Sequence, residues 1–108
     1  MATVKLTEAD SHRQVAVSPG DKAEVRLPEN PTTGFRWHAV SEPPGALVLE
    51  SDGMETAGGA PGAGGVRVLS FRTTSPGLVA LRLKLWRDWE GESSVQARHD
   101  FVLEVKAP

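Results

Sequence analysis

Three short segments of this 108-residue sequence combine residue types that could bind another molecule. The first has the sequence NPTTGF and begins at Asn30. Pro31 fixes its own φ and favours an extended Asn30, while Gly34 can adopt a positive φ. Thr32 and Thr33 would therefore be held at the tip of a stiff turn. Turn chemistry alone leaves two interpretations open, a well-formed connection between strands and a rigid binding loop.

The second segment is a glycine-rich run between residues 58 and 65. Backbone without side chains can approach a partner closely, but such a run is also typical of a flexible connection. A phosphate-binding loop is not expected, because that kind of loop requires a following helix and a Lys-Ser/Thr ending. Here a strand pattern follows from Val66, and no lysine is near.

The third segment contains Trp86, Arg87, Asp88 and Trp89. Alternation along the preceding residues places Trp86 on the face opposite Leu85, and Trp89 falls beyond the end of that pattern. Trp and Arg dominate binding hot spots, so an exposed pair here would suit a protein interface. The alternative is that Trp89 folds back over the core.

Catalytic and metal-binding chemistry has little support in the sequence. There is no cysteine, no G-x-S-x-G motif surrounds a serine, and His12, His38 and His99 are far apart along the chain. No H-x-x-x-H pair and no EF-hand loop is present. Glu90 and Glu92 are near neighbours, but we expect them to be solvated in a loop. The sequence therefore predicts a protein that is not an enzyme and that holds no metal ion or cofactor.

The composition narrows the class of protein further. There are 12 Lys and Arg residues against 14 Asp and Glu residues, giving a formal net charge of −2, and 39% of residues are hydrophobic. A nucleic-acid-binding protein would show a basic surplus, and the hydrophobic residues are too dispersed for a membrane span. Domains of about 100–150 residues are the usual size, so we expect a single domain over residues 1–108. The first residues contain no apolar stretch of signal-peptide length, which leaves the location open between the cytoplasm and an exported, mature domain.

The elements that must position the three segments are strands. Apolar residues alternate with period two between short Gly and Pro clusters, as half-buried strands require. Strands are expected at about residues 3–6, 13–17, 22–27, 35–40, 46–51, 66–73, 79–86 and 99–106. This pattern predicts an all-β fold, an immunoglobulin-like antiparallel β-sandwich of about eight strands. An up-and-down barrel is the competing architecture.

The same strand order predicts where the connections lie. Successive antiparallel strands alternate in direction, so every second connection emerges at the same end of the sandwich. The connections 28–34, 52–65 and 87–98 should therefore cluster at one end, and they carry the three segments described above. Binding residues tend to lie on loops held by a rigid scaffold, so this end is the expected functional site.

Taken in order, the three segments resemble the chagasin-type inhibitors of papain-like cysteine peptidases. That family is marked by N-P-T-T-G-(F/Y) followed soon by Trp, then by G-x-G-G, then by R-P-(W/F). Here the first motif is intact and is followed by Trp37, the second is GAGG at residues 62–65, and the third is RDW at residues 87–89. The order and spacing fit, and the strand patterns match across nearly the whole chain.

The resemblance implies an eight-stranded immunoglobulin-like sandwich that inhibits its peptidase reversibly and competitively. Three loops would enter the active-site cleft, and the loop with Thr32 and Thr33 would sit over the catalytic cysteine and histidine. The glycine-rich loop would pair along the non-primed side, and Arg87 and Trp89 would cover the primed side. The implied peptidase-binding residues are Asn30, Pro31, Thr32, Thr33, Gly34, Phe35, Pro61, Gly62, Ala63, Gly64, Gly65, Arg87, Asp88 and Trp89. The implied partner is a peptidase of the papain or cathepsin L type, and the free inhibitor is expected to be a monomer.

Two positions depart from the family pattern. Asp88 stands where the family usually has Pro, and Ala60-Pro61 precedes the second motif where a larger apolar residue is expected. We therefore expect weaker or narrower inhibition than the best members show. A rival hypothesis is a β-sandwich module that binds a glycan or a partner protein and inhibits nothing.

Overall fold

The computed structural model describes residues 2–56 and 64–107, which form eight strands and three short 3-10 turns. The strands are β1 (Thr3–Leu6), β2 (Gln14–Val17), β3 (Lys22–Glu29), β4 (Arg36–Glu42), β5 (Leu47–Thr56), β6 (Gly65–Thr73), β7 (Gly77–Trp86) and β8 (Ala97–Val105). The 3-10 turns are η1 (Glu8–Asp10), η2 (Pro31–Thr33) and η3 (Glu92–Ser94).

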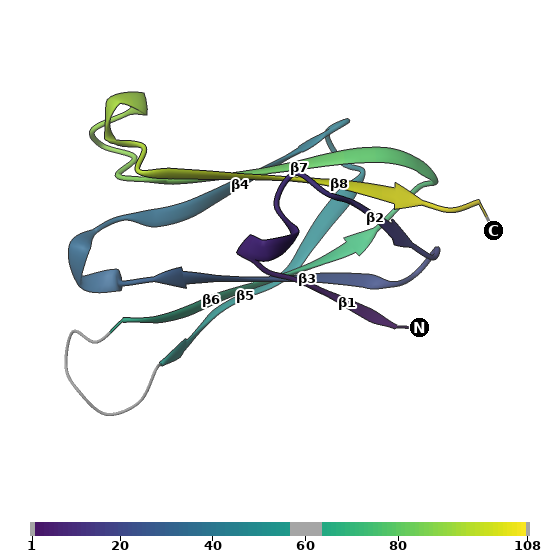
Figure 1. The fold of residues 1–108 in the computed structure, drawn as a ribbon, viewed down its shortest axis with the longest axis horizontal. Helices are drawn as coiled ribbons and strands as arrows, with labels where there is room; N and C mark the ends of the chain where they lie inside the picture. Colours follow the sequence, from purple (N-terminus) through teal and green to yellow (C-terminus); the bar gives the residue numbers. More distant parts are fainter. Residues whose placement is uncertain (1, 57–63, 108) are drawn as a thin grey trace.

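The strands form two four-stranded sheets that pack face to face (Figure 1). One sheet has the order β1-β3-β6-β5 and the other has the order β2-β8-β7-β4. Because the two sheets are separate, the architecture is a sandwich and not a barrel. The predicted all-β, immunoglobulin-like sandwich is confirmed.

The two N-terminal strands pair in a way that alternation could not reveal. β1 pairs with β3 and β2 pairs with β8, and both pairings are parallel, whereas the other four pairings are antiparallel. The chain crosses from the first sheet to the second between β1 and β2, with η1 in the connection. The chain therefore connects the two sheets at the edge where β1 and β2 lie. On the other side of the sandwich, β4 and β5 are the edge strands of their sheets.

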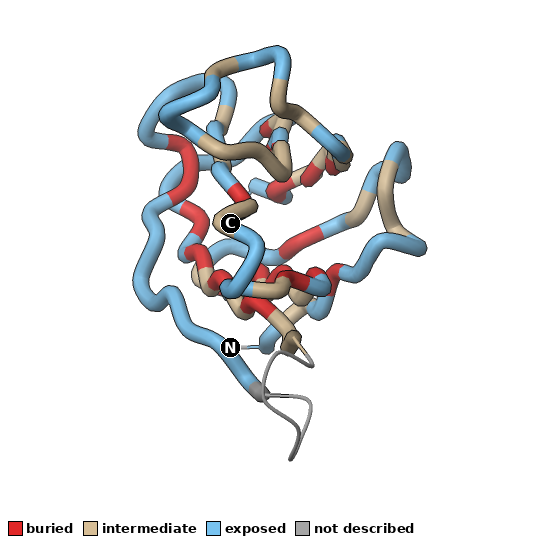
Figure 2. Tube along the Cα trace, turned by 90° about the vertical axis from the view of Figure 1, so that its left-hand side faces the viewer, coloured by how far each residue is buried: buried red, intermediate tan, exposed pale blue. Residues whose placement is uncertain are grey.

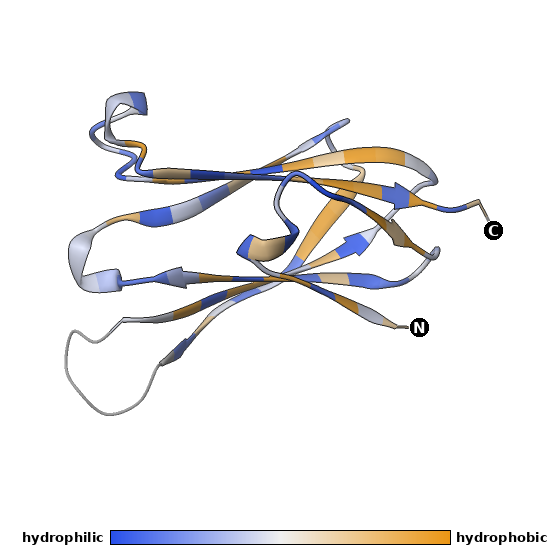
Figure 3. Cartoon of the chain, viewed as in Figure 1, coloured by the Kyte–Doolittle hydropathy of each residue, from blue (hydrophilic) through white to orange (hydrophobic). Residues whose placement is uncertain are grey.

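The core lies between the sheets and is built from the inward-facing half of each alternating pattern. Figure 2 shows buried residues along the strands and exposed residues at the connections, and Figure 3 shows hydrophobic and hydrophilic residues alternating along the strands. The largest fully buried side chains are Phe101, Leu6, Leu27, Leu81, Leu83, Leu103, Val17, Val25 and Val79. Burial of side chains of this size stabilises a fold by about 1.5–3 kcal/mol each.

All three expected connections are shorter than predicted, because β3 continues to Glu29, β8 already begins at Ala97, and β5 continues well past its expected end. Residues 52–56 belong to β5, and β6 begins at Gly65, so the expected loop 52–65 narrows to residues 57–64. A bulge between Leu49 and Ser51 shifts the register of β5, and this hides the rest of the strand from a search for simple alternation. Gly65 pairs with Thr56 of β5 and Glu29 of β3, and the position requires glycine because a Cβ there would collide with the Glu55 carbonyl.

The connections that contain η2 and η3 lie at the same end of the sandwich, as the strand order predicted (Figure 1). η2 lies between β3 and β4, η3 lies between β7 and β8, and the end of β5 and the start of β6 point the same way. We refer to residues 30–34 as the first loop and to residues 87–96 as the third loop.

The part of the chain that the structure describes contains no helix long and apolar enough to cross a membrane.

Candidate functional site

The structure brings most of the predicted binding residues together at one end of the sandwich. The first loop, Gly64 and Gly65 at the start of β6, and Arg87 to Trp89 at the end of β7 all lie there. The predicted residues Pro61, Gly62 and Ala63 lie outside the described residues.

The first loop is stiffened by hydrogen bonds within itself. The Asn30 carboxamide oxygen accepts the Thr32 N–H at 3.1 Å and the Thr32 hydroxyl at 2.7 Å. The Thr33 hydroxyl donates to the Asn30 carbonyl at 2.8 Å. Asn30 therefore acts as the N-cap of η2, with Pro31 at the first position of the turn, as both residue types favour. The predicted stiff turn is confirmed.

Gly34 ends η2 with φ at +80°, in the left-handed region that glycine occupies most readily. A Cβ at this position would meet the Cη2 atom of Trp89 at 2.7 Å. Two separate constraints therefore require glycine here, the backbone angle and the ring of Trp89.

The ends of the first loop are joined by Trp37 on β4. Its indole Nε1–H donates to the Pro28 carbonyl at 2.9 Å, and its backbone N–H donates to the Glu29 carboxylate at 2.8 Å. Since β3 and β4 belong to different sheets, no strand ladder can join them. These two bonds take the place of a ladder and close the base of the loop.

Behind this base lies a buried ion-pair network of Glu29, Arg67 and Asp52. Arg67 donates from Nη1 to Glu29 at 2.9 Å and from Nε and Nη2 to the two oxygens of Asp52, the Nη2 bond being 2.7 Å. The exposed fractions of the side chains are 1% for Glu29, 8% for Arg67 and 37% for Asp52. Hydrogen bonding to Asp52 raises the pKa of Arg67 above its ordinary value, so the guanidinium stays charged.

Arg87 joins the third loop to the first. Its Nε and Nη2 donate to the Thr33 carbonyl at 3.1 and 2.9 Å, and its guanidinium carbon lies 4.3 Å from the centre of the Phe35 ring. Its Nη1 also pairs with Glu90 at 3.1 Å. The sequence placed Arg87 at a partner surface, whereas in the free protein its side chain holds the first loop in place.

Trp89 is 69% exposed, so the alternative in which it covers the core is wrong. The Cη2 and Cζ2 edge of its ring lies against Gly34, and most of the side chain is open to solvent. An exposed aromatic residue held against a stiff loop has the character of an interface anchor.

The third loop is closed mainly by Ser94 in η3. The Arg87 N–H donates to the Ser94 hydroxyl oxygen at 3.0 Å, and the hydroxyl donates to the Gly91 carbonyl at 2.7 Å. Glu92 of this loop pairs with two residues outside it, Lys84 at 2.5 Å and Arg98 at 2.6 Å. Hydrogen bonding to Lys84 and then to Arg98 lowers the pKa of Glu92 below its ordinary value.

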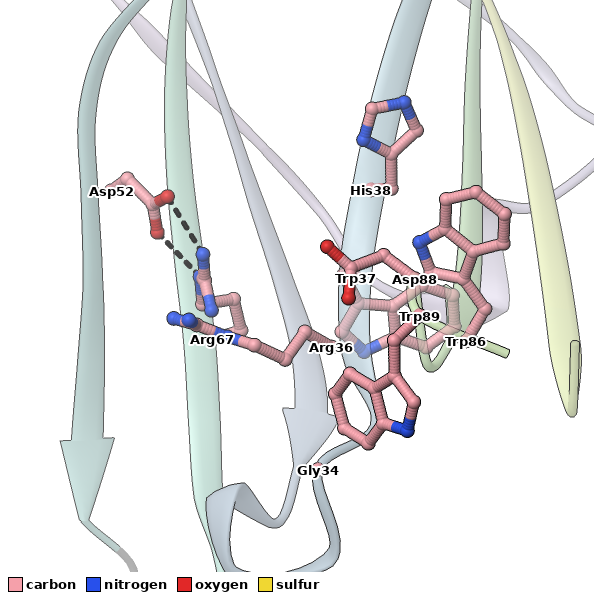
Figure 4. A pocket seen from close by; sticks show the side chains of 9 residues that line it. All are labelled: Gly34, Arg36, Trp37, His38, Asp52, Arg67, Trp86, Asp88 and Trp89. Atoms are coloured by element: carbon pink, nitrogen blue, oxygen red, sulfur yellow. Dashed lines mark hydrogen bonds and ion pairs between the residues drawn. The ribbon is translucent and has the colours of Figure 1, made fainter. Parts of the chain in front are cut away.

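A groove of about 560 Å³ opens beside the two loops, between the edge strands β4 and β5 (Figure 4). Asp52 and Arg67 form one side of it, and Trp86 and Trp89 lie on the other side. The groove therefore separates the Arg67–Asp52 ion pair from the half-buried Trp86 and the exposed Trp89.

The histidines and carboxylates do not form a catalytic or metal-binding arrangement in residues 2–56 and 64–107. No group of three His, Cys, Asp or Glu residues in these ranges could hold a metal ion. The His38 ring lies 5.8 Å from the Trp86 ring and the His99 ring lies 5.4 Å from the Trp37 ring, so both pack against indoles.

Sequence reasoning missed the ion pair behind the first loop. Glu29 continues the inward-facing series of Val25 and Leu27, and Arg67 occupies an inward position of the series that includes Leu69. A charged residue at an inward position is a sign of a buried partner, and this signal was present on both strands.

Comparisons with known proteins identify the family of this chain. Residues 16–105 match the family described as Chagasin family peptidase inhibitor I42. Chagasin of Trypanosoma cruzi is 31% identical over 108 residues, which covers 95% of this chain and 96% of chagasin.

Two solved structures have the same fold. The crystal structure of the cysteine protease inhibitor EhICP2 from Entamoeba histolytica has a TM-score of 0.86 at 21% identity, covering 98% of this chain and 97% of that one. PbICP-C, solved in complex with falcipain-2, has a TM-score of 0.62 at 12% identity, covering 97% of this chain and 92% of that one. Because the matched family consists of peptidase inhibitors, the rival hypothesis of a non-inhibitory binding module is not favoured. The chain belongs to the chagasin family of peptidase inhibitors, as its three loop motifs predicted.

Proposed function

We propose that this protein inhibits papain-like cysteine peptidases reversibly and competitively, by inserting the end of the sandwich that carries the three loops into the active-site cleft. The observation that supports this most directly is that the first loop lies between Gly64 at the start of β6 and Trp89 in the third loop. A Cβ at Gly64 would lie 3.5 Å from Asn30, and a Cβ at Gly34 would lie 2.7 Å from Trp89. The first loop is therefore the central element of the proposed binding edge.

The conformation of the first loop supports inhibition without cleavage. Thr32 and Thr33 lie in a 3-10 turn whose hydroxyls bond within the loop. A peptidase cleaves a peptide that lies extended across its catalytic residues, and this turn does not offer such a segment. We propose that the turn covers the catalytic cysteine and histidine and blocks access to them.

The flanking segments would extend the contact on both sides. The glycine-rich residues 62–65 would pair with the enzyme backbone along the non-primed side, as a substrate strand does. Trp89 would stack against an aromatic or apolar surface on the primed side, with Asp88 at its edge. Because the first loop is already ordered, little conformational entropy is lost on docking, and this favours tight binding.

The test is a titration of papain, or of a cathepsin L-like enzyme, with the purified protein. We expect the apparent inhibition constant to rise with substrate concentration, as competition requires, and the recovered inhibitor to remain uncleaved by mass spectrometry. Trypsin serves as a control that should keep full activity. Full papain activity at micromolar inhibitor would contradict the proposal, and a cleaved first loop would contradict its mechanism.

A second measurement addresses strength. Asp88 in place of Pro leaves the tip of the third loop less stiff, so we expect weaker or narrower inhibition than in the best family members. A picomolar inhibition constant against several papain-like enzymes would contradict this expectation.

A further inference from the structure

We propose that Glu29 and Arg67 are positioning residues for the first loop, and that their ion pair sets how strongly the protein inhibits its target. This inference rests on the proposed function. It concerns two side chains that lie behind the binding edge, with exposed fractions of 1% and 8%, where a docked enzyme would not reach them.

The first loop needs support because of its place in the fold. It connects β3 in one sheet to β4 in the other, so the hydrogen-bonded ladders that hold most hairpins are absent at its base. Glu29 supplies a substitute, since its carboxylate accepts the backbone N–H of Trp37 at 2.8 Å across the gap between the sheets. The next residue is Asn30, the N-cap of η2. Because the two residues are adjacent in the chain, the position of Glu29 determines the position of this cap.

Arg67 in turn holds Glu29 in place. Its Nη1 donates to the second carboxylate oxygen of Glu29 at 2.9 Å, and its other nitrogens bond both oxygens of Asp52. The resulting chain of contacts from Trp37 through Glu29 and Arg67 to Asp52 runs across β4, β3, β6 and β5. It joins the base of the first loop to the two strands that flank residues 57–64.

The network fixes the position of the first loop more than it adds to the stability of the fold. A buried ion pair stabilises a fold little compared with apolar side chains of the same volume, because both charges must leave water. An apolar pair at these positions would fill the space but would leave the Trp37 N–H without its acceptor. Hydrogen bonds of fixed geometry hold a binding loop within the fraction of an ångström that tight docking requires.

Loss of the network should therefore reduce the fraction of molecules whose first loop has the docking conformation. The apparent inhibition constant rises in inverse proportion to that fraction. We expect it to rise about tenfold in Glu29→Gln, which keeps an acceptor for Trp37 but removes the charge that fixes Arg67. Arg67→Met should have at least the same effect, because it leaves the Glu29 carboxylate buried without its cation.

The experiment compares these variants with Val79→Ala, which opens the core at a residue 1% exposed near the opposite end of the sandwich. Melting temperatures of all variants are measured, together with their inhibition constants on papain. The positioning role is supported if the inhibition constant rises for the two network variants but stays within twofold of the parent protein for Val79→Ala. Val79→Ala must lose a similar amount of melting temperature for this comparison. An equal rise in all three, or in none, overturns it.

Amide hydrogen exchange separates this inference from the proposed function. We expect faster exchange at Thr33 and Gly34, whose N–H groups bond within the loop, in Glu29→Gln but not in Val79→Ala. If the parent protein does not inhibit papain, the proposed function fails, while the exchange comparison still decides whether Glu29 positions the loop. Unchanged exchange in Glu29→Gln overturns the inference even if papain is inhibited.

A milder variant covers the case in which Glu29→Gln and Arg67→Met do not fold. Asp52 is 37% exposed and bonds only the outer side of Arg67, so Asp52→Asn should leave the domain folded. We expect a smaller rise in the inhibition constant, about threefold, with a correspondingly smaller increase in exchange at Thr33 and Gly34. No change in either measurement for a folded Asp52→Asn would overturn the network as a positioning device.

Discussion

The first and third loops lie side by side at the same end of the sandwich, but they are stiffened in different ways. The first loop has hydrogen bonds of its own through Asn30, and it is also held from outside, by Trp37 and Glu29 at its base and by Arg87 from the neighbouring loop. The third loop is held largely from within, by Ser94, with exposed ion pairs of Glu92 at its edge.

The difference shows how a chain can form a rigid binding edge from two loops that differ in how far their own hydrogen bonds hold them. Five residues are too few to bury a core of their own, so the first loop depends on side chains that the rest of the fold supplies. The longer third loop can close on itself and then supports its neighbour through Arg87. Substitutions that disturb Arg87 or Ser94 should therefore affect both loops. Substitutions at the exposed ion pairs of Glu92 should affect only the third loop.

The largest expected effect concerns Trp89, where the two loops meet. Trp89→Ala should raise the inhibition constant on papain about 30-fold, or about 2 kcal/mol, which is the scale of an interface hot spot. Because the side chain is 69% exposed, the free energy of unfolding should change little. Enzyme inhibition and urea unfolding measure the two quantities.

Leu78→Ala is the matched control for Trp89→Ala. Leu78 is an apolar residue 61% exposed at the start of β7, near the opposite end of the sandwich. It should leave the inhibition constant unchanged. Unfolding of Trp89→Ala, or equal effects of the two variants on inhibition, would show that Trp89 is not an interface anchor.

Gly34→Ala tests the contact between the loops. It combines the cost of a left-handed backbone, about 1–2 kcal/mol, with a collision between the new Cβ and Trp89. Gly45→Ala is the control, since Gly45 has φ +83° but nothing within 4 Å of a Cβ. Both variants should lose stability in urea unfolding, and only Gly34→Ala should also weaken inhibition, by several-fold. Equal inhibition by both would mean that Trp89 moves aside freely.

Ser94→Ala tests the internal closure of the third loop. It removes the acceptor of the Arg87 N–H and a 2.7 Å bond to Gly91, and we expect a loss of about 1 kcal/mol in unfolding free energy. Inhibition should weaken by a few-fold, because Arg87 also holds Thr33. Ser93→Ala, which loses only a 3.4 Å bond to Glu90, should change neither quantity. A silent Ser94→Ala would show that the ion pairs of Glu92 close the loop instead.

The smallest expected effect is the pH dependence of those ion pairs. The pKa of Glu92 is lower in the folded protein, so the stability it contributes is present above its ordinary pKa of about 4.3 and is lost as pH falls through the folded value. Urea unfolding of the parent protein and of Glu92→Gln, followed from pH 6 to pH 3, isolates this contribution. The gap between them should be constant above about pH 5 and shrink below about pH 4. A gap that persists at pH 3 would show that charge on Glu92 is not its cause.

Much of the fold and part of the site followed from local rules. Alternation identified strands such as β7 and β8, and Pro31 and Gly34 predicted the stiff first loop because both act on their own backbone angles. The end of β5 could not be predicted, because the bulge after Leu49 breaks the alternation of apolar and polar residues that marks a strand. The parallel pairings of β1 with β3 and of β2 with β8 could not be predicted either, because the residue pattern of a strand does not show which strand lies next to it.

By itself, the sequence determined the class of fold, the family and the identity of the loops, because these depend on residue types at short spacing. Tertiary structure alone decided what holds the loops in place. Glu29 meets Arg67 from 38 residues away, and Arg87 reaches Thr33 from 54 residues away. Side-chain bonds of this kind form between whichever residues the packed sheets bring together, and no local pattern encodes which pairs those are.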